Sequence, residues 1–261
     1  MISDLFPSPQ RWPYEKWLYT AWFRFLVRYR RTLLGPVWLL VGPTLFVVTL
    51  GLLFAEIGSQ NPGQFVPHLT VGLITWTLIS GFVTGSTTVF HRSRAQILQG
   101  GMSLTDIVMV DICSTFLLFL HQAVLIVVVF AIVGVDLSLY ALLSLAGLAL
   151  LVVNGIWLTH FFGIIGARYR DLDEIVSAIM RIAFLATPII WMPGESTRGG
   201  IMGAFLVFNP FYHYLELIRG PLLGQPASLL SWTVVLAITV VGFLLANHFH
   251  RRFARYIPLW V

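Results

Sequence analysis

Six apolar stretches, each long enough to cross a lipid bilayer as a helix, limit most strongly what this chain can fold into. They lie at residues 36–55, 66–90, 107–133, 138–166, 175–192 and 228–247. A helix needs about 20 apolar residues to cross a hydrocarbon core of about 30 Å. Only 10% of the 261 residues are charged, too few to give a soluble protein of this size its polar surface. We therefore predict an all-α membrane protein with six transmembrane helices in a single domain, residues 1–261.

Basic residues gather on one side of these predicted spans. Six precede the first span, and more arginines follow the second, fourth and sixth spans. The loops at 56–65 and 134–137 contain no arginine or lysine. Basic loops stay in the cytoplasm, so both termini are predicted to be cytoplasmic. The net charge of +5 then reflects loops that face anionic lipid, and we expect no nucleic-acid partner. The first 31 residues lack the apolar run of a cleavable signal peptide.

Two short helices are predicted on the cytoplasmic side. Across residues 14–31, apolar and aromatic residues recur at steps of three and four, with Lys16, Thr20 and Arg24 on the opposite arc. This pattern is typical of an amphipathic helix in the membrane interface, serving as an anchor, a partner-docking element or both. Residues 91–98 predict a second short helix that ends at a glycine pair. Ser103 and Asp106 then have the spacing of a capping box for the third span.

The segment between the fifth and sixth spans predicts a helical hairpin at the outer face. Residues 201–208 are apolar but too short to cross the membrane, and Asn209-Pro210 interrupts them. Residues 211–218 form a second short apolar stretch. Two half-length helices over about 200–222 suit a re-entrant hairpin, since non-spanning backbone must pack on protein or line a cavity. This indicates a transport pathway.

Several functions are disfavoured by missing motifs. Lys16 is the only lysine and lies outside any phosphate-binding loop, so the chain is not expected to hydrolyse ATP by that route. No His-Glu-x-x-His or Gly-x-Ser-x-Gly motif supports an intramembrane protease. The lone Cys113 lies in an apolar run. We predict no catalytic residues and no metal site, and an ion-coupled transporter stays as an alternative.

Three segments resemble permease subunits of the type-2 ABC exporter family, above all the branch that exports bacterial polysaccharides. They are RYRRTLLGPVWL at 28–39, GARYRDL at 166–172 followed by TPIIW at 187–191, and NPFYHYLELIRGPL at 209–222. The order of these segments agrees with the predicted spans, interface helix and hairpin. A drug or small-lipid pump of the same family is the second reading.

The resemblance implies a half-transporter in the bacterial inner membrane. A second copy of the chain would complete the channel, and two copies of a separate ABC ATPase would bind ATP and magnesium, with no cofactor on this chain. The substrate would be a glycan on undecaprenyl diphosphate, such as an O-antigen, capsule or teichoic acid. The family's ATPase-coupling segment falls here on Arg92, Arg94, Ala95, Gln96, Leu98 and Gln99.

Three further sets of residues are assigned roles. Arginine forms bidentate bonds with phosphate, and the arginines at the cytoplasmic ends of spans are Arg28, Arg30, Arg31, Arg168 and Arg170. Their alternative role is to set topology and bind lipid headgroups. The aromatic residues expected along a glycan pathway, or else packing helices, are Trp38, Phe46, Phe184, Trp191, Phe208, Phe211 and Tyr212. Asp111 and Arg181 lie at similar depth and predict a structural ion pair.

Overall fold

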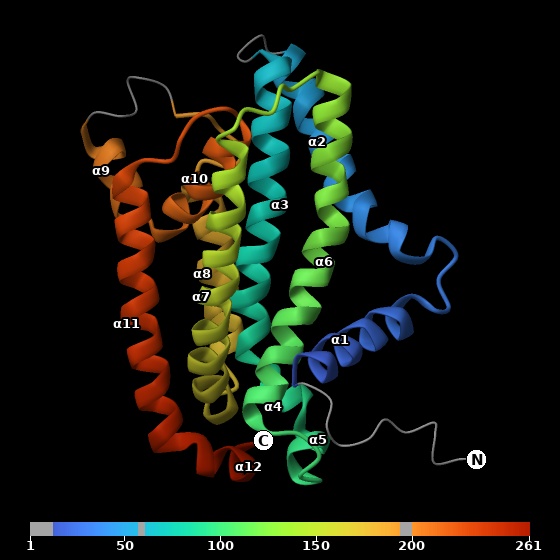
Figure 1. Cartoon of the computed structure of the whole chain (residues 1–261), viewed down its shortest axis with the longest axis vertical. Coiled ribbons are helices and arrows are strands. Elements are labelled where there is room, and N and C mark those ends of the chain that lie inside the picture. The colour runs from blue at the N-terminus through green and yellow to red at the C-terminus, as the bar shows by residue number, and fades with distance from the viewer. Residues whose placement is uncertain (1–12, 57–60, 194–199) are drawn as a thin grey trace.

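The computed structural model describes residues 13–56, 61–193 and 200–261, and its regular elements in those ranges are all helical (Figure 1). The long helices are α2 (Trp38–Glu56), α3 (Pro62–Thr87), α6 (Leu104–Val133), α7 (Ala141–Arg168) and α11 (Leu229–Phe253). The shorter ones are α1 (Pro13–Tyr29), α4 (Val89–Arg92), α5 (Arg94–Leu98), α8 (Leu172–Ala186), α9 (Gly200–Phe208), α10 (Pro210–Leu222) and α12 (Ile257–Trp260). Two 3-10 turns, η2 (Gly35–Val37) and η4 (Ala254–Tyr256), join α2 and α12 to the chain before them.

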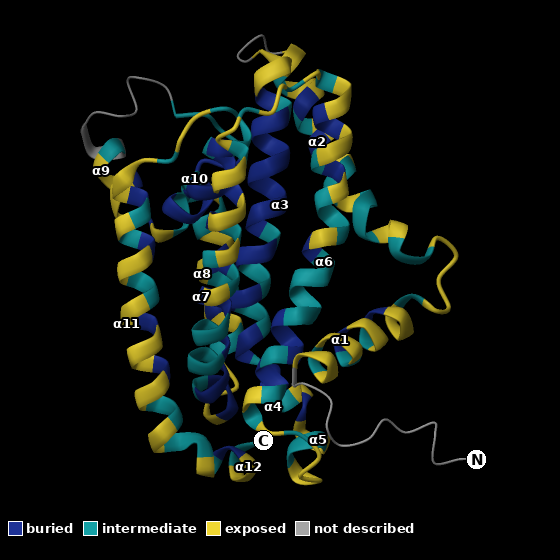
Figure 2. Cartoon of the chain, viewed as in Figure 1, coloured by how far each residue is buried: buried dark blue, intermediate teal, exposed yellow. Residues whose placement is uncertain are grey.

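Helix α3 is the centre of the bundle. It packs mainly against α6 and α7, and also contacts α2, α8 and α10. Phe65, Leu69, Ile74 and Phe82 on α3 are almost completely buried, and Figure 2 shows α3 dark along most of its length. A helix that is apolar on all sides and buried on all sides belongs in the middle of such a bundle. The helices around α3 instead keep broad apolar faces exposed.

Five helices in the described ranges are long and apolar enough to cross a membrane. They correspond to five of the six predicted spans. The remaining prediction is the fifth span, at 175–192. It coincides with α8, which has only 15 residues and rises about 22 Å. The helix ends there because Pro188 pushes Thr187 out of the helical region, to φ −94° and ψ 138°. The predicted continuous helix through 192 is therefore wrong, and α8 alone is too short for an untilted span.

Polar side chains within the long helices bond to one another inside the bundle. Asn154 of α7 donates to Thr239 Oγ1 of α11 at 2.8 Å. Thr77 of α3 donates to Gln122 Oε1 of α6 at 2.7 Å. Such bonds hold neighbouring helices in a fixed rotation where little water competes for the polar groups.

Helix α1 crosses α6 near the end of the bundle that also holds α4, α5 and α12, which we call the lower end (Figure 1). Its buried face includes Ala21 and Phe25. Most of its other side chains are exposed, including the large Tyr19, Trp22 and Phe23. The predicted amphipathic helix is thus present. One apolar stripe packs on α6, and further aromatic residues remain exposed.

Candidate functional site

The start of α6 fixes α1 to the lower end of the bundle. Ser103 Oγ accepts a bond from the Asp106 backbone nitrogen at 3.1 Å, and the Asp106 carboxylate accepts from the Ser103 nitrogen at 3.2 Å. This confirms the predicted capping box. The same carboxylate accepts from Lys16 Nζ at 3.1 Å and from Trp17 Nε1 at 2.7 Å. One side chain therefore begins α6 and holds α1 against it.

The segment predicted as one helix over 91–98 consists of two helical turns, α4 and α5. They meet at Ser93, whose φ of −104° and ψ of 14° break the helix. After α5, Gly100 adopts a positive φ of 66° and turns the chain toward α6. Exposed side chains of α5 and its end are those of Arg94, Ala95, Leu98 and Gln99. The residues expected to contact an ATPase therefore lie on a compact projection of the lower end.

Asp111 has a different partner from the one predicted. Its carboxylate pairs with Arg92 Nη2 at 3.2 Å, so the expected pair with Arg181 is wrong. Arg92 also donates to the Gly85 carbonyl oxygen at 2.5 Å. Arg92 reaches Asp111 because α4 turns back beneath the end of α3, next to α6. Arg181 is exposed on α8, which packs on α3.

The five arginines predicted to meet a lipid diphosphate lie at the ends of two different helices. Arg28 is on α1, and Arg30 and Arg31 are exposed just after it. Arg168 ends α7 and lies over the rings of Tyr169 and Trp260, with its guanidinium carbon 5.4 and 5.3 Å from their centroids. Arg170 is exposed beyond it. Arg24 was not assigned to these arginines, yet it lies one helical turn before Arg28 on the same side of α1 and donates to Gln96 Oε1 of α5 at 3.5 Å.

Three of the predicted pathway aromatics come together around a residue that sequence analysis missed. Trp76 of α3 lies 5.7 Å from Phe184 of α8 and 5.3 Å from Phe211 of α10, measured between ring centroids. Phe184 also meets Phe46 of α2 at 6.3 Å. Four helices therefore contribute to one row of rings. A tryptophan in the middle of a span, away from the membrane surface where this residue is enriched, was the available signal.

Beside this row, an open groove of about 510 Å³ runs between α3 and α8. Its lining combines aromatic, hydroxyl and charged groups: Trp76, Ser80, Thr84, Ser177, Arg181 and Phe184. On another face of α8, a more apolar groove of about 410 Å³ faces the α9–α10 pair and includes Phe208, Asn209 and Phe211. Phe208 is 84% exposed. The other predicted aromatics lie apart: Trp38 is exposed on α2, Trp191 bonds to the Leu185 carbonyl oxygen, and Tyr212 lies against His213.

The predicted pair of short helices is present as α9 and α10, and Asn209 separates them. Asn209 Oδ1 accepts from the backbone nitrogen of Phe211 at 3.0 Å and begins α10. Its Nδ2 donates to Thr187 Oγ1 at 3.0 Å, at the end of α8. Arg219 of α10 is buried, donates to the Pro188 carbonyl oxygen at 2.5 Å and lies 3.1 Å from His68 Nε2 of α3. Two polar links thus tie α10 to the end of α8.

We expect Asn209→Ala to lower the free energy of unfolding by about 1–2 kcal/mol, because it removes the cap of α10 and the bond to Thr187 together. Thermal unfolding of the purified chain in detergent measures the effect. Asn247→Ala, at an exposed position within α11, is the matched control and should change the melting temperature little. Equal melting temperatures for both variants would show that Asn209 does not hold the hairpin.

Comparison with known proteins decides the family. Residues 15–223 match the ABC-2 type transporter family, which is most of the chain. The chain belongs to this family. It is 26% identical over 192 residues to the O-antigen export system permease protein RfbA of Myxococcus xanthus, covering 70% of each chain. It is also 24% identical over 237 residues to a protein of the same name from Klebsiella pneumoniae, covering 87% of this chain and 89% of the relative.

Membership of the family agrees with the resemblance found in the sequence. The chain is a multi-pass membrane protein of an ABC transporter, and its relatives are named as permease subunits. The family implies an ABC ATPase partner for such a subunit.

Proposed function

We propose that the chain is the channel-forming permease subunit of an ATP-driven exporter that moves a lipid-linked polysaccharide across the bacterial inner membrane. The names of its relatives favour an O-antigen as the glycan. The observation that carries the proposal is the groove between α3 and α8, where an arginine, three hydroxyl side chains and aromatic rings share one open face.

Arg181 shows why this groove is not expected to face lipid. It lies nine residues after the start of α8, about 14 Å along the helix. At such a depth, a guanidinium in contact with lipid costs several kcal/mol. The cost disappears if the groove lines a water-filled path. Aromatic rings in that path give weak, non-directional contact with the apolar faces of sugars, which suits a chain that must slide.

A second copy of the chain would close this half-open path. Large apolar residues on the outer face of α8 remain exposed: Ile175, Ile179, Ile182 and Leu185. Helix α2 is also mostly exposed, and Phe46 reaches from it to Phe184. A homodimer formed along α2 and α8 would cover these faces. In this arrangement, α8 and the following residues 187–191 make a sixth crossing, so both termini are cytoplasmic. Helices α9 and α10 then re-enter the membrane from the outer side.

The lower end would contact the ATPase and receive the substrate. We place two copies of a separate ABC ATPase, with ATP and magnesium, against α5 and α1. The diphosphate of an undecaprenyl-linked glycan would approach through the arginines at the C-terminal ends of α1 and α7. At the other end, α9 and α10 would cover the exit. Their links to Thr187 and Pro188 make the pair follow any tilt of α8.

Replacing Arg181 with leucine tests the direction that the groove faces. If the groove lines the export path, we expect at least a tenfold fall in polysaccharide at the cell surface, with normal amounts of the chain in the membrane. If the groove faced lipid, leucine would be favoured there and export would stay normal. Arg252→Leu, at an exposed position at the lower end of α11, is the control. Export of a small lipid but no polysaccharide by the native complex would also contradict the proposal.

A further inference from the structure

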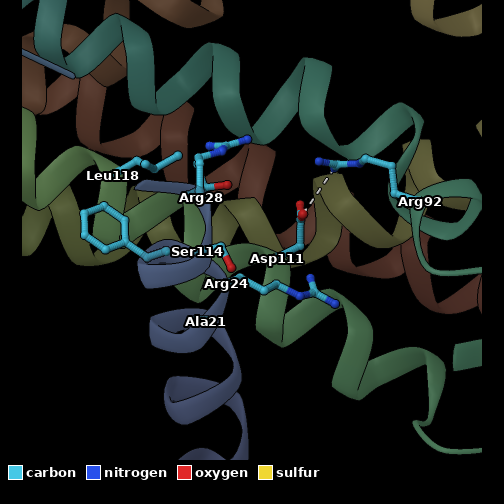
Figure 3. A pocket seen from close by; sticks show the side chains of 9 residues that line it. Ala21, Arg24, Arg28, Arg92, Asp111, Ser114 and Leu118 are labelled. Carbon is cyan, nitrogen blue, oxygen red and sulfur yellow. Dashed lines mark hydrogen bonds and ion pairs between the residues drawn. The ribbon is translucent and has the colours of Figure 1, made fainter. Parts of the chain in front are cut away.

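A polar cavity of about 180 Å³ lies at the lower end of the bundle, between α1, the end of α4 and α6. Figure 3 shows Arg24 and Arg28 of α1 and Arg92 of α4 around Ser114 and Asp111 of α6. Three segments separated in the sequence therefore bring three guanidinium groups to one partly open cavity. Of the residues that line this cavity, the pathway proposed above uses only Arg28, one of the arginines at which a lipid diphosphate would arrive.

The charges in the cavity do not balance. Among the residues that the structure describes, three arginines face one carboxylate, and that carboxylate is already paired with Arg92. Arg24 is half-buried, and the pKa of its guanidinium is lowered, mainly by burial. The charge of Asp111 raises this pKa in part, and the charge of Arg92 lowers it further. An arginine nevertheless stays protonated in proteins. Arg28 has no hydrogen bond or ion pair with the described part of the chain. Two positive charges are thus left to attract an anion.

We propose that this cavity binds one lipid-borne phosphate group, held between the guanidinium groups of Arg24 and Arg28. Arginine forms bidentate, charge-assisted bonds with phosphate oxygens. A water molecule takes about 30 Å³ in the liquid, so the cavity has room for a phosphate and a few waters. Phe25 and Leu118 line the same cavity and offer an apolar wall to the start of a lipid tail.

Two lipids carry this chemistry: an anionic phospholipid of the membrane, and the diphosphate of the lipid-linked substrate. Only the second rests on the proposed function. In either case the bound phosphate would compete with Asp111 for Arg92, and with Gln96 for Arg24. Arg92 ends α4 and Gln96 lies in α5, so occupancy of the cavity would change the bonds that hold the α4–α5 segment.

Binding is measured by native mass spectrometry on the purified full chain in phosphate-free detergent. Two probes are added separately, phosphatidylglycerol and undecaprenyl diphosphate. We expect Arg24→Gln and Arg28→Gln each to weaken binding by about tenfold, the effect of losing one charge-assisted pair. Arg252→Gln removes the same charge outside the cavity and should leave the affinity unchanged. Arg28 is exposed, so its variant should fold normally even if Arg24→Gln does not.

The probe that binds more weakly to the arginine variants identifies the ligand. Weaker binding of both probes supports a general phosphate site, loss for undecaprenyl diphosphate alone supports a substrate site, and loss for phosphatidylglycerol alone supports a membrane-lipid site. Wild-type affinity of both arginine variants for both probes would overturn the proposal. So would an equal loss in Arg252→Gln, because overall charge would then explain binding. The isolated chain is used, so the result does not depend on whether the complex exports polysaccharide.

Asp111→Asn separates electrostatics from packing. The variant removes the Asp111 carboxylate from the cavity and releases Arg92 to the ligand, while asparagine can still accept a bond from Arg92. We expect the probe to bind several-fold more tightly. An affinity that stayed constant or fell would contradict an anion site here.

Discussion

Replacing Gly166 with alanine is expected to destabilise the chain strongly and to lower the yield of folded protein. A Cβ at this position would overlap the carbonyl oxygen of Thr87 and lie 2.8 Å from its carbonyl carbon. Both atoms belong to the backbone of α3, which cannot rotate aside as a side chain does. Overpacking a core typically costs about 1–3 kcal/mol, and we expect the upper end of that range because a helix must move.

The same crossing carries polar contacts that would shift with α3. Thr87 Oγ1 donates to Asp173 Oδ1 at 2.6 Å, and His91 Nε2 lies 3.2 Å from the Gly166 carbonyl oxygen. The first bond joins α3 to the start of α8, which closely follows α7, and the second joins α4, which follows α3, to α7. Both would therefore lengthen if α3 and α7 separated. Glycine is therefore expected here because it lets two helix backbones approach closely.

The experiment compares Gly166→Ala with Gly42→Ala. The control adds a methyl group in α2, where no atom lies within 4 Å of the new Cβ. The fraction of each variant that elutes as a single detergent-solubilised species, relative to the amount in the membrane, is the measurement. We expect a severalfold loss for Gly166→Ala and none for Gly42→Ala. Equal yields would mean that α3 and α7 are not as close as the structure has them.

Local signals in the sequence predicted local structure well. The spacing of Ser103 and Asp106 predicted the capping box, and Asn209-Pro210 predicted the break between α9 and α10. Each depends on residues within one turn of one another, so no tertiary information is needed. Five long apolar stretches likewise gave the five long helices, since length and apolarity alone identify a membrane-crossing helix.

The fifth predicted span shows where apolarity is not enough. Ile189 and Ile190 extend the apolar run beyond Pro188, so hydropathy continues through the break. Ile189 is completely buried against α3, and its Cγ2 lies 3.5 Å from the position of a Cβ on Gly72. Its apolarity serves packing inside the protein rather than contact with lipid. A single sequence does not separate these two reasons for an apolar residue.

The wrong partner for Asp111 has a related cause. Counting residues from the end of each span placed Asp111 and Arg181 at similar depth, but depth leaves the rotation of each helix undetermined. The Asp111 carboxylate instead meets the end of α4, which pairs it with Arg92. The same limit explains why Arg24 and Trp76 were given no role, while only Phe46, Phe184 and Phe211 of the seven predicted aromatics lie in one row of rings.

Replacing Leu98 with aspartate is expected to reduce export at least tenfold while leaving the chain in the membrane. Leu98 is the last residue of α5 and is 55% exposed. An apolar side chain at this place suits a contact with a partner surface, which the proposed function assigns to the ATPase. A carboxylate buried there without a partner would cost several kcal/mol. Ala95→Asp, one turn earlier on the exposed side of α5, should act in the same way.

The size of the effect follows from how α5 is held. Gln96 accepts from Arg24 of α1, and Arg92 just before α5 pairs with Asp111 of α6. If the ATPase displaces α5, these bonds would therefore move α1 and α6 as well. Losing the contact at Leu98 would prevent the ATPase from displacing α5. Leu139→Asp is the control: Leu139 is 87% exposed but lies in the loop between α6 and α7, at the opposite end of the bundle (Figure 1). Cell-surface polysaccharide and ATPase stimulation in the reconstituted complex are the two measurements. Normal values of both in Leu98→Asp would show that α5 does not carry motion from the ATPase to the membrane helices.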